Sequence, residues 1–149
     1  MTHEETALNA FQKGANCAQA VLVAYAEDLG MDESYALKLA SSFGGGIGRL
    51  REVCGAVSGM MMVYGLLRGY NDLNDPEAKK SHYAHVQALA GRFREENGSI
   101  ICRELLSLNK DENNDPNPTP RDAQFFHARP CLGFVASATR ILDDALKEE

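Results

Sequence analysis

Four cysteines are the residues of this chain best suited to carry out chemistry: Cys17, Cys54, Cys102 and Cys131. The thiolate form of cysteine is both a nucleophile and a metal ligand. No pair has C-x-x-C spacing, so the chain lacks the motif of thioredoxin-like proteins, the local knuckle of a zinc finger and the C-x-x-C-H motif that attaches haem. Cysteines that act together must therefore be gathered by the fold, either as two disulfide pairs in one of three pairings or as one four-thiolate site.

Each cysteine follows a signal for the start of a helix. The signals are Asn16 before Cys17, the glycine-rich run 44–48 before Cys54, Ser99 before Cys102 and Pro130 before Cys131. The unpaired N–H groups and the positive dipole end of a helix start stabilise a nearby thiolate. We therefore predict that all four cysteines lie at or within one turn of a helix N-terminus. The nucleophilic, low-pKa thiolate is expected to be Cys54 or Cys131.

The segments that must position these cysteines are themselves helical in pattern. Capping residues, apolar periodicity and glycine or proline stops predict helices over about 2–14, 16–29, 32–40, 53–67, 75–96, 99–106 and 131–146, with one long loop over 109–120. No alternating strand pattern, internal repeat or second domain is visible in the sequence. The fold class predicted is all-α, a single-domain bundle of about six to seven helices over residues 1–149 that carries one four-cysteine site.

Glycines beside the cysteines are expected to allow close approach of the backbone. The run Gly44–Gly48 is interpreted as a tight turn that lets Cys54 reach the other thiols. Gly55 and Gly59 are expected to let another helix pack closely against the helix that begins at Cys54.

Three charged or titratable residues are candidate partners of the thiols. Arg49 and Arg51 come just ahead of Cys54, where positive charge would favour its thiolate. His127 lies four residues before Cys131 and is a candidate for lowering that thiol's pKa or for donating a proton.

Composition limits the classes of function. The chain is 44% hydrophobic and 24% charged, which is ordinary for a globular protein. A net charge of −6 with scattered Lys and Arg argues against nucleic-acid binding, and no apolar stretch approaches the twenty residues of a membrane span. The first residues lack a secretory signal, so we expect a cytoplasmic protein, in which thiols are normally kept reduced.

The cysteines also belong to a longer pattern. Its parts are Asn16-Cys17-Ala18-Gln19-Ala20-Val21, Gly44-Gly45-Gly46-Ile47, the CGAxxG string Cys54-Gly55-Ala56-Val57-Ser58-Gly59, Cys102-Arg103-Glu104-Leu105-Leu106, and Pro130-Cys131. This pattern resembles the family of redox-active proteins named for its C_GCAxxG_C_C cysteines, from about Asn16 to the last helix. The resemblance implies a redox role for all four cysteines and a redox partner, as yet unknown, connected with transport. A related helical module in split-Soret-type cytochromes adds iron–sulfur or electron-transfer chemistry by analogy alone.

Three functions remain open from the sequence. The first is a thiol/disulfide oxidoreductase, in which the cysteines pair two by two with Cα atoms within about 7 Å. The second is a four-thiolate site for an iron–sulfur cluster or zinc, in which Cys17, Cys54, Cys102 and Cys131 converge on one point. The third is a helical interaction module with inert, buried cysteines. A homodimer would suit a small helical protein with a Met-rich stretch.

Overall fold

The all-α prediction is confirmed by a computed structural model, which describes residues 1–107, 115–118, 120–122 and 130–149. The described residues form seven α-helices and one short 3-10 helix, with no β-strand among them. In chain order these are α1 (His3–Gln12), α2 (Cys17–Ala24), α3 (Glu33–Ala40), η1 (Ser41–Phe43), α4 (Gly55–Arg68), α5 (Pro76–Asn97), α6 (Cys102–Leu105) and α8 (Cys131–Lys147). The long loop predicted over 109–120 lies largely outside the described residues.

The helices begin where local capping chemistry predicts. Thr2 and Asn16 each form a capping box, in which the cap side chain and the third helical residue exchange hydrogen bonds with backbone N–H groups. Asp32 and Asp75 each accept a backbone hydrogen bond at the starts of α3 and α5. At its other end, α5 stops at Gly98, whose φ of 96° lies in the left-handed region.

Two helices are shorter than the sequence pattern suggests. The helix expected over 16–29 ends at Ala24, because its last N–H groups bond three residues back, as from Tyr25 N to Leu22 O at 3.1 Å, and tighten the turn. The helix expected over 99–106 contains only Cys102–Leu105, since the residues before it pair with another segment of backbone.

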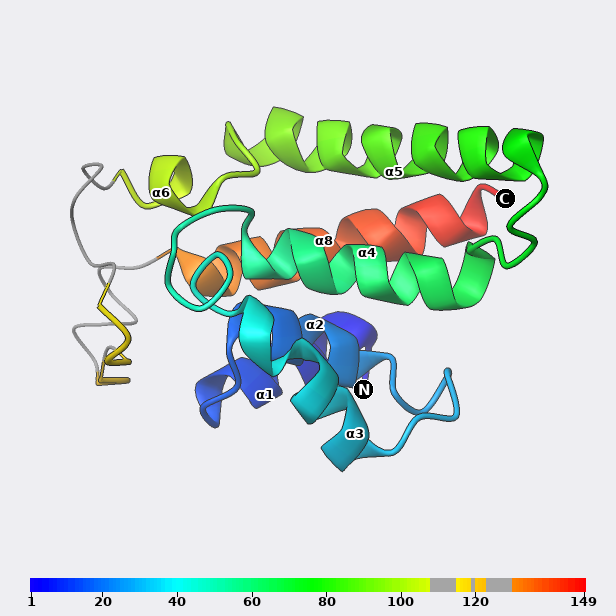
Figure 1. The fold of residues 1–149 in the computed structure, drawn as a ribbon. Coiled ribbons are helices and arrows are strands. Elements are labelled where there is room, and N and C mark those ends of the chain that lie inside the picture. Colours follow the sequence, from blue (N-terminus) through cyan, green and yellow to red (C-terminus); the bar gives the residue numbers. More distant parts are fainter. Residues whose placement is uncertain (108–114, 119, 123–129) are drawn as a thin grey trace.

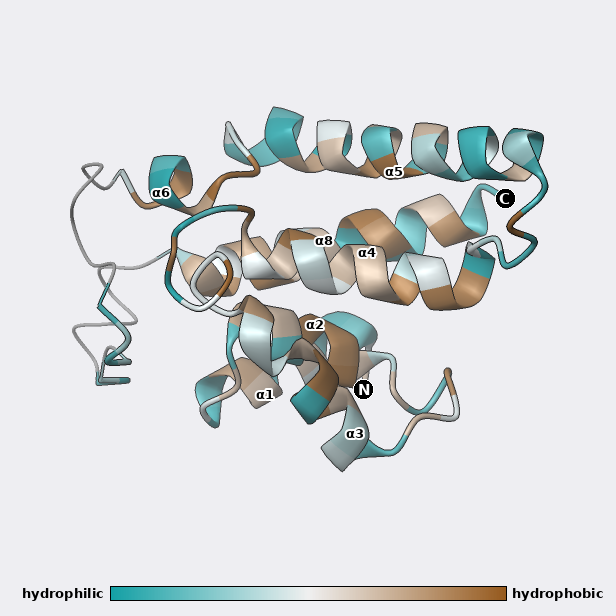
Figure 2. Ribbon diagram, viewed as in Figure 1, coloured by the Kyte–Doolittle hydropathy of each residue, from teal (hydrophilic) through white to brown (hydrophobic). Residues whose placement is uncertain are grey.

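The bundle is arranged around α4 and α8, which lie side by side, with α5 on one side and α1, α2 and α3 on the other (Figure 1). The outward face of α5 is hydrophilic, whereas α2 and the inner faces of α4 and α8 are hydrophobic (Figure 2). Three helices, α2, α4 and α8, begin at the same end of the bundle, on the left in Figure 1, where α6 also lies. This parallel placement brings three helix N-termini together.

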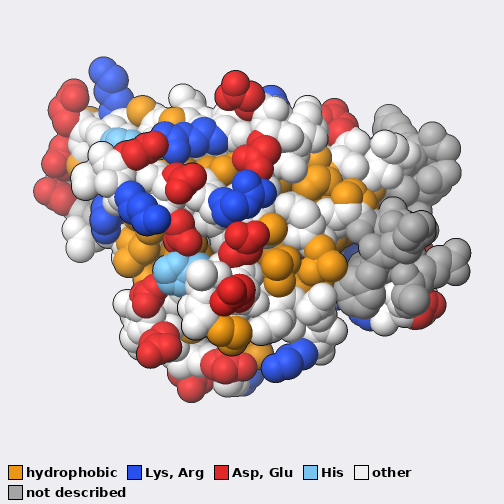
Figure 3. Space-filling model, turned by 180° about the vertical axis from the view of Figure 1, so that it is seen from behind, with side chains coloured by type: hydrophobic (Ala, Val, Ile, Leu, Met, Phe, Trp, Pro, Cys, Tyr) orange, Lys and Arg blue, Asp and Glu red, His pale blue; other side chains and the backbone are white. Residues whose placement is uncertain are grey.

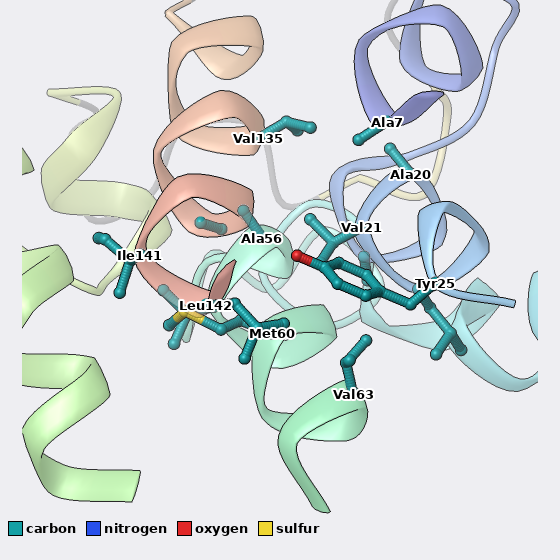
Figure 4. Packing of buried hydrophobic residues seen from close by; sticks show 14 of the residues in the cluster. Ala7, Ala20, Val21, Tyr25, Ala56, Met60, Val63, Val135, Ile141 and Leu142 are labelled. Carbon is teal, nitrogen blue, oxygen red and sulfur yellow. The ribbon is translucent and has the colours of Figure 1, made fainter. Parts of the chain in front are cut away.

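Close packing between α2, α4 and α8 fixes their relative positions. Met60 and Val63 from α4, Leu142 from α8, and Val21 and Tyr25 from the α2 segment point toward one another in Figure 4, and all are essentially buried. Burying one such aliphatic side chain stabilises the fold by roughly 1.5–3 kcal/mol. The core therefore holds the starts of these helices in register.

The surface seen from behind carries acidic and basic side chains interspersed over the helices (Figure 3). Among the described residues, no helix combines the length and the apolar character needed to cross a membrane.

Candidate functional site

Cys54 and Cys102 are brought together by a short antiparallel pairing of backbone. Cys54 N donates to Ile100 O at 2.8 Å and Cys102 N donates to Glu52 O at 2.7 Å, on either side of an isolated bridge between residues 53 and 101. Side chains alternate between the two faces of such a ribbon, so Cys54 and Cys102 lie on the same face as diagonal neighbours. Both thiols are buried.

Cys17 and Cys131 form the second pair, through the starts of α2 and α8. The pKa of Cys17 is raised well above its ordinary value, first by a side-chain hydrogen bond to Cys131 and then by burial. Both residues are partly exposed, and none of the four cysteines is in a disulfide.

Gly55 and Gly59 allow α4 to start directly against α2. A Cβ at Gly55 would lie 3.0 Å from Ala18 N and 3.2 Å from Cys17 Cβ, and a Cβ at Gly59 would lie 2.9 Å from Ala18 O. The close helix contact predicted from these glycines is present, and it places the Cys54 end of α4 beside Cys17.

The glycine-rich loop makes an equally close approach. Five consecutive residues have left-handed φ values between 53° and 70°: Gly45, Gly46, Ile47, Gly48 and Arg49. A Cβ at Gly46 would lie 2.8 Å from Cys102 Cβ, and one at Gly44 would overlap the side chain of Asn16, the cap of α2. The loop thus runs between the Cys17 cap and Cys102, and left-handed φ at the β-branched Ile47 is strained backbone.

The expectation that helix starts make low-pKa thiols is wrong for Cys54 and Cys17. Burial raises the pKa of Cys54 to about 12, although the backbone N–H groups of Ala56 and Val57, in the first turn of α4, act to lower it. Desolvation outweighs the helix start because the sulfur is removed from water on nearly all sides. The negative charge of neighbouring thiolates raises both pKa values further, that of Cys54 through Cys102 and Cys131 and that of Cys17 through the other three cysteines.

Arg49 and Arg51 both line the cavity that holds the cysteines. The Arg51 side chain is buried, with the residue 3% exposed, and its Nη1 donates to Cys102 Sγ at 3.6 Å. Arg49 Nε donates to Asp115 O at 2.8 Å. The third predicted helper, His127, lies outside the described residues.

Arg121 is a site residue that the sequence analysis missed. It donates through Nη1 to Phe11 O at 2.8 Å and through Nη2 to Ala15 O at 3.1 Å, with its guanidinium 4.2 Å from the centre of the Phe11 ring. Burial lowers the pKa of Arg121, while the charges of Cys17 and Cys131 raise it. No local pattern marks this arginine, because the two carbonyls that it bonds belong to residues more than a hundred positions away in the chain.

All four cysteines line one cavity of about 400 Å³. Its other lining residues include Arg49, Arg51 and Arg121, the loop glycines Gly44, Gly45, Gly46 and Gly48, and the apolar Phe11, Leu105, Leu106 and Phe134. Within the described ranges, no three or more His, Cys, Asp or Glu side chains are grouped so as to hold a metal ion. The cysteines thus share a cavity, in which Cys17 is hydrogen-bonded to Cys131 and the backbone pairing holds Cys54 and Cys102 on one face of a ribbon.

One of three comparisons with known proteins identifies a family. Residues 15–145 match the family model described as "Putative redox-active protein (C_GCAxxG_C_C)". No curated protein and no solved structure is significantly similar to the chain.

Proposed function

Because the chain belongs to the redox-active family named for the C_GCAxxG_C_C cysteines, we propose that it is a thiol/disulfide oxidoreductase with two dithiol pairs. The pairs are Cys17–Cys131 and Cys54–Cys102. The observation that carries the proposal is the hydrogen bond between Cys17 and Cys131, which puts two sulfurs side by side at the starts of two helices. Contact between sulfurs is what disulfide formation and exchange require.

Cys131 is the attacking sulfur in this proposal. It is the hydrogen-bond partner of Cys17, begins the 17-residue helix α8, is partly exposed, and interacts electrostatically with Arg121. A helix start, partial exposure and the charge of Arg121 act on Cys17 as well as on Cys131, so the raised pKa of Cys17 is what assigns the attacking role to Cys131. Cys17, which keeps its proton longer, is the resolving thiol.

The exchange balances in two steps. The Cys131 thiolate bonds to one sulfur of a substrate disulfide, whose S–S bond breaks, and the leaving thiolate takes up a proton. Cys17, losing its own proton, then bonds to Cys131 Sγ and expels the second substrate thiol. The substrate gains two electrons and two protons, and the protein keeps a Cys17–Cys131 disulfide.

The buried pair supplies a second dithiol. All four sulfurs line the same cavity, and the charges of Cys54 and Cys102 both act on Cys17. Exchange between the pairs would pass two electrons and two protons from Cys54 and Cys102 to the Cys17–Cys131 disulfide. An external dithiol then reduces the Cys54–Cys102 disulfide back to two thiols.

The experiment is to trap the mixed disulfide. The Cys17→Ser protein, treated with dithiodiethanol, should accumulate one substrate thiol on Cys131, as read by intact mass and peptide mapping. Cys131→Ser should form little adduct, and the wild type should pass directly to a Cys17–Cys131 disulfide. Equal trapping in both variants, a different disulfide, or full activity after all four cysteines become serine would overturn the proposal.

A four-thiolate cluster or zinc site is the second candidate, favoured by one observation. The same cavity is lined by every cysteine of the chain. Metal analysis of protein purified without oxygen distinguishes the two. Stoichiometric iron or zinc with all thiols protected would support the metal site, whereas four thiols that fall to two or none on mild oxidation would support the exchange cycle.

The redox partner and the oligomeric state of the protein are also matters of proposal. We propose a redox partner connected with transport, and a homodimer. Sedimentation of the reduced and oxidised chain would test the second of these directly.

A further inference from the structure

The two thiols of the buried pair receive hydrogen bonds of different kinds. Burial raises the pKa of Cys54 to about 12, although the backbone N–H groups of Ala56 and Val57 act to lower it. The sulfur of Cys102 accepts a hydrogen bond from a charged side chain, Arg51 Nη1, at 3.6 Å. Thiol/disulfide exchange starts from a thiolate, and near neutral pH the Cys54 sulfur is protonated. A thiolate on this pair must therefore come from Cys102.

The hydrogen bond between Arg51 and Cys102 has only one possible direction. A guanidinium has no acceptor atom and keeps its proton in proteins, so Arg51 donates and the sulfur accepts. A hydrogen bond donated to the sulfur is stronger with a thiolate than with a thiol, because the thiolate carries a full negative charge. The contact thus favours ionisation of Cys102, and this follows from the direction of the bond alone.

The backbone fixes Arg51 beside this sulfur. Arg51 N donates to Gly45 O in the glycine-rich loop at 3.1 Å, and Arg51 O accepts from Arg103 N, the residue after Cys102, at 3.2 Å. Its φ of 64° lies in the left-handed region, which is strained for a residue with a side chain. The residue is only 3% exposed, and arginine is rarely buried to this degree unless its N–H groups are paired. The sulfur of Cys102 is one such partner.

Resting on the proposed function, we infer that Arg51 is a positioning residue that holds Cys102 as the attacking thiolate of the buried pair. The Cys102 thiolate bonds to one sulfur of the Cys17–Cys131 disulfide, whose S–S bond breaks, and the leaving thiolate takes up a proton. Cys54 then loses its proton, bonds to Cys102 Sγ and expels the other sulfur, which is protonated in turn. Two electrons and two protons pass to Cys17 and Cys131, and a Cys54–Cys102 disulfide remains.

Ionisation of each buried sulfur is tested without any redox step, through the ultraviolet absorbance of the thiolate. Two proteins are compared, in which serine replaces every cysteine except Cys102 or except Cys54. Cys102 should be half ionised at or below about pH 8.5, the ordinary value of a free thiol, whereas Cys54 should stay protonated beyond about pH 10. Arg51→Gln in the first protein should raise the titration midpoint of Cys102 by about one pH unit, which leaves about tenfold less thiolate at neutral pH.

Matched variants separate the hydrogen bond from a general effect of charge or of folding. Arg51→Lys keeps a charged N–H donor and should recover part of the shift. Arg92→Gln removes an exposed arginine that pairs with Glu148, and it should leave the titration of Cys102 unchanged. Because a buried arginine also contributes to folding, circular dichroism checks each variant, and the comparison of Cys102 with Cys54 keeps Arg51 in place. An unchanged midpoint in Arg51→Gln, or a Cys102 that ionises no earlier than Cys54, would overturn the inference.

Trapped mixed disulfides then show which sulfur attacks. Cys54→Ser protein, treated with dithiodiethanol at neutral pH, should form a disulfide between Cys102 and either Cys17 or Cys131, because the second step is blocked. Cys102→Ser should form little of the corresponding disulfide with Cys54. Peptide mapping after an acid quench measures both, and equal amounts in the two variants would overturn the inference.

The proposed function fails by a different result. It fails if dithiodiethanol never produces a Cys17–Cys131 disulfide in the wild type. The absorbance titration of Cys102 does not depend on that outcome, so the two failures are distinguishable.

Discussion

At the scale of single residues, two opposing effects set the pKa of a buried thiol: burial raises it, and the backbone N–H groups of a helix start lower it. Cys54 is the N-cap of α4, where the backbone N–H groups of Ala56 and Val57 favour its anion, yet its pKa stands at about 12 because the sulfur is buried. The pKa of Cys17 is raised, mainly by its side-chain hydrogen bond with Cys131. In the proposed exchange, Cys131 is therefore the sulfur that attacks first.

The raised pKa of Cys54 predicts a specific alkaline loss of stability. In the unfolded chain this thiol titrates near about 8.5, whereas in the fold it holds its proton up to about 12. Its contribution to stability is therefore complete below the unfolded pKa and is lost as pH rises through this window. The wild type should lose up to about 1.4 kcal/mol more per pH unit than Cys54→Ser between about pH 9 and 11.

Urea unfolding under a reductant, at several alkaline pH values, measures both slopes. Tyr25, whose pKa is raised by burial and by its hydrogen bond to Asp143, contributes equally to the two proteins and cancels in the comparison. Identical slopes for wild type and Cys54→Ser would show that the folded thiol titrates normally.

At the scale of elements, glycines decide how closely the helix starts approach each other. Gly59 and Gly65 lie on the same helix, but only Gly59 faces α2: a Cβ there would meet Ala18 O and Val21 Cβ at 2.9 Å, while a Cβ at Gly65 would meet nothing within 4 Å. The two positions thus separate packing from intrinsic helix preference.

Gly59→Ala should destabilise the protein by about 1–3 kcal/mol, since an added methyl must push α2 and α4 apart. Gly65→Ala on the same helix should be neutral or stabilise by up to about 1 kcal/mol, because alanine is the better helix former. Chemical denaturation of both variants checks this. Equal effects at the two positions would mean that the α2–α4 contact is looser than the structure has it.

The glycine-rich loop allows a similar paired test. Gly46 and Gly48 both have left-handed φ, at 70° and 53°, but only at Gly46 would a Cβ collide with Glu52 N and Cys102 Cβ. Gly48→Ala should lose roughly 1–2 kcal/mol of stability from backbone conformation alone.

Gly46→Ala should lose more than Gly48→Ala, and it should also displace Cys102. The added readout is the rate at which diamide forms the Cys54–Cys102 disulfide in protein that carries Ser at positions 17 and 131. This rate should fall for Gly46→Ala and stay unchanged for Gly48→Ala. A normal rate in both would show that the loop does not set the position of Cys102.

At the scale of the whole molecule, the Cys17–Cys131 contact joins the beginning of the chain to its end. The two residues start α2 and α8, which pack on each other and on α4 in the middle of the bundle. A disulfide here would close a loop of more than a hundred residues.

Oxidation of this pair alone should stabilise the protein. In the Cys54→Ser/Cys102→Ser background, forming the Cys17–Cys131 disulfide should add up to roughly 4–5 kcal/mol, the chain-entropy value for a loop of this length. Urea unfolding of the oxidised and reduced forms measures the difference. An oxidised form less stable than the reduced one would mean that the disulfide needs a rearranged fold.

The helices and the local positions of the cysteines could be read from the sequence alone. Caps such as Thr2, Asn16, Asp32 and Asp75 act over three residues, so their hydrogen bonds are encoded within one turn of chain. For the same reason the sequence predicts that every cysteine lies at a helix start. It also predicts the need for glycine in the helix that follows Cys54.

Only the tertiary structure decided which cysteine meets which, whether each thiol is charged, and which arginines surround them. Cys54 and Cys102 lie on one face because the backbone of segment 52–54 pairs with that of segment 100–102, and no local sequence pattern predicts this pairing. Burial reversed the pKa expected from the helix start at Cys54, because desolvation depends on everything packed around the sulfur. Arg121 reached the site for the same non-local reason, since its position follows from the packing of the bundle and not from its neighbours in sequence.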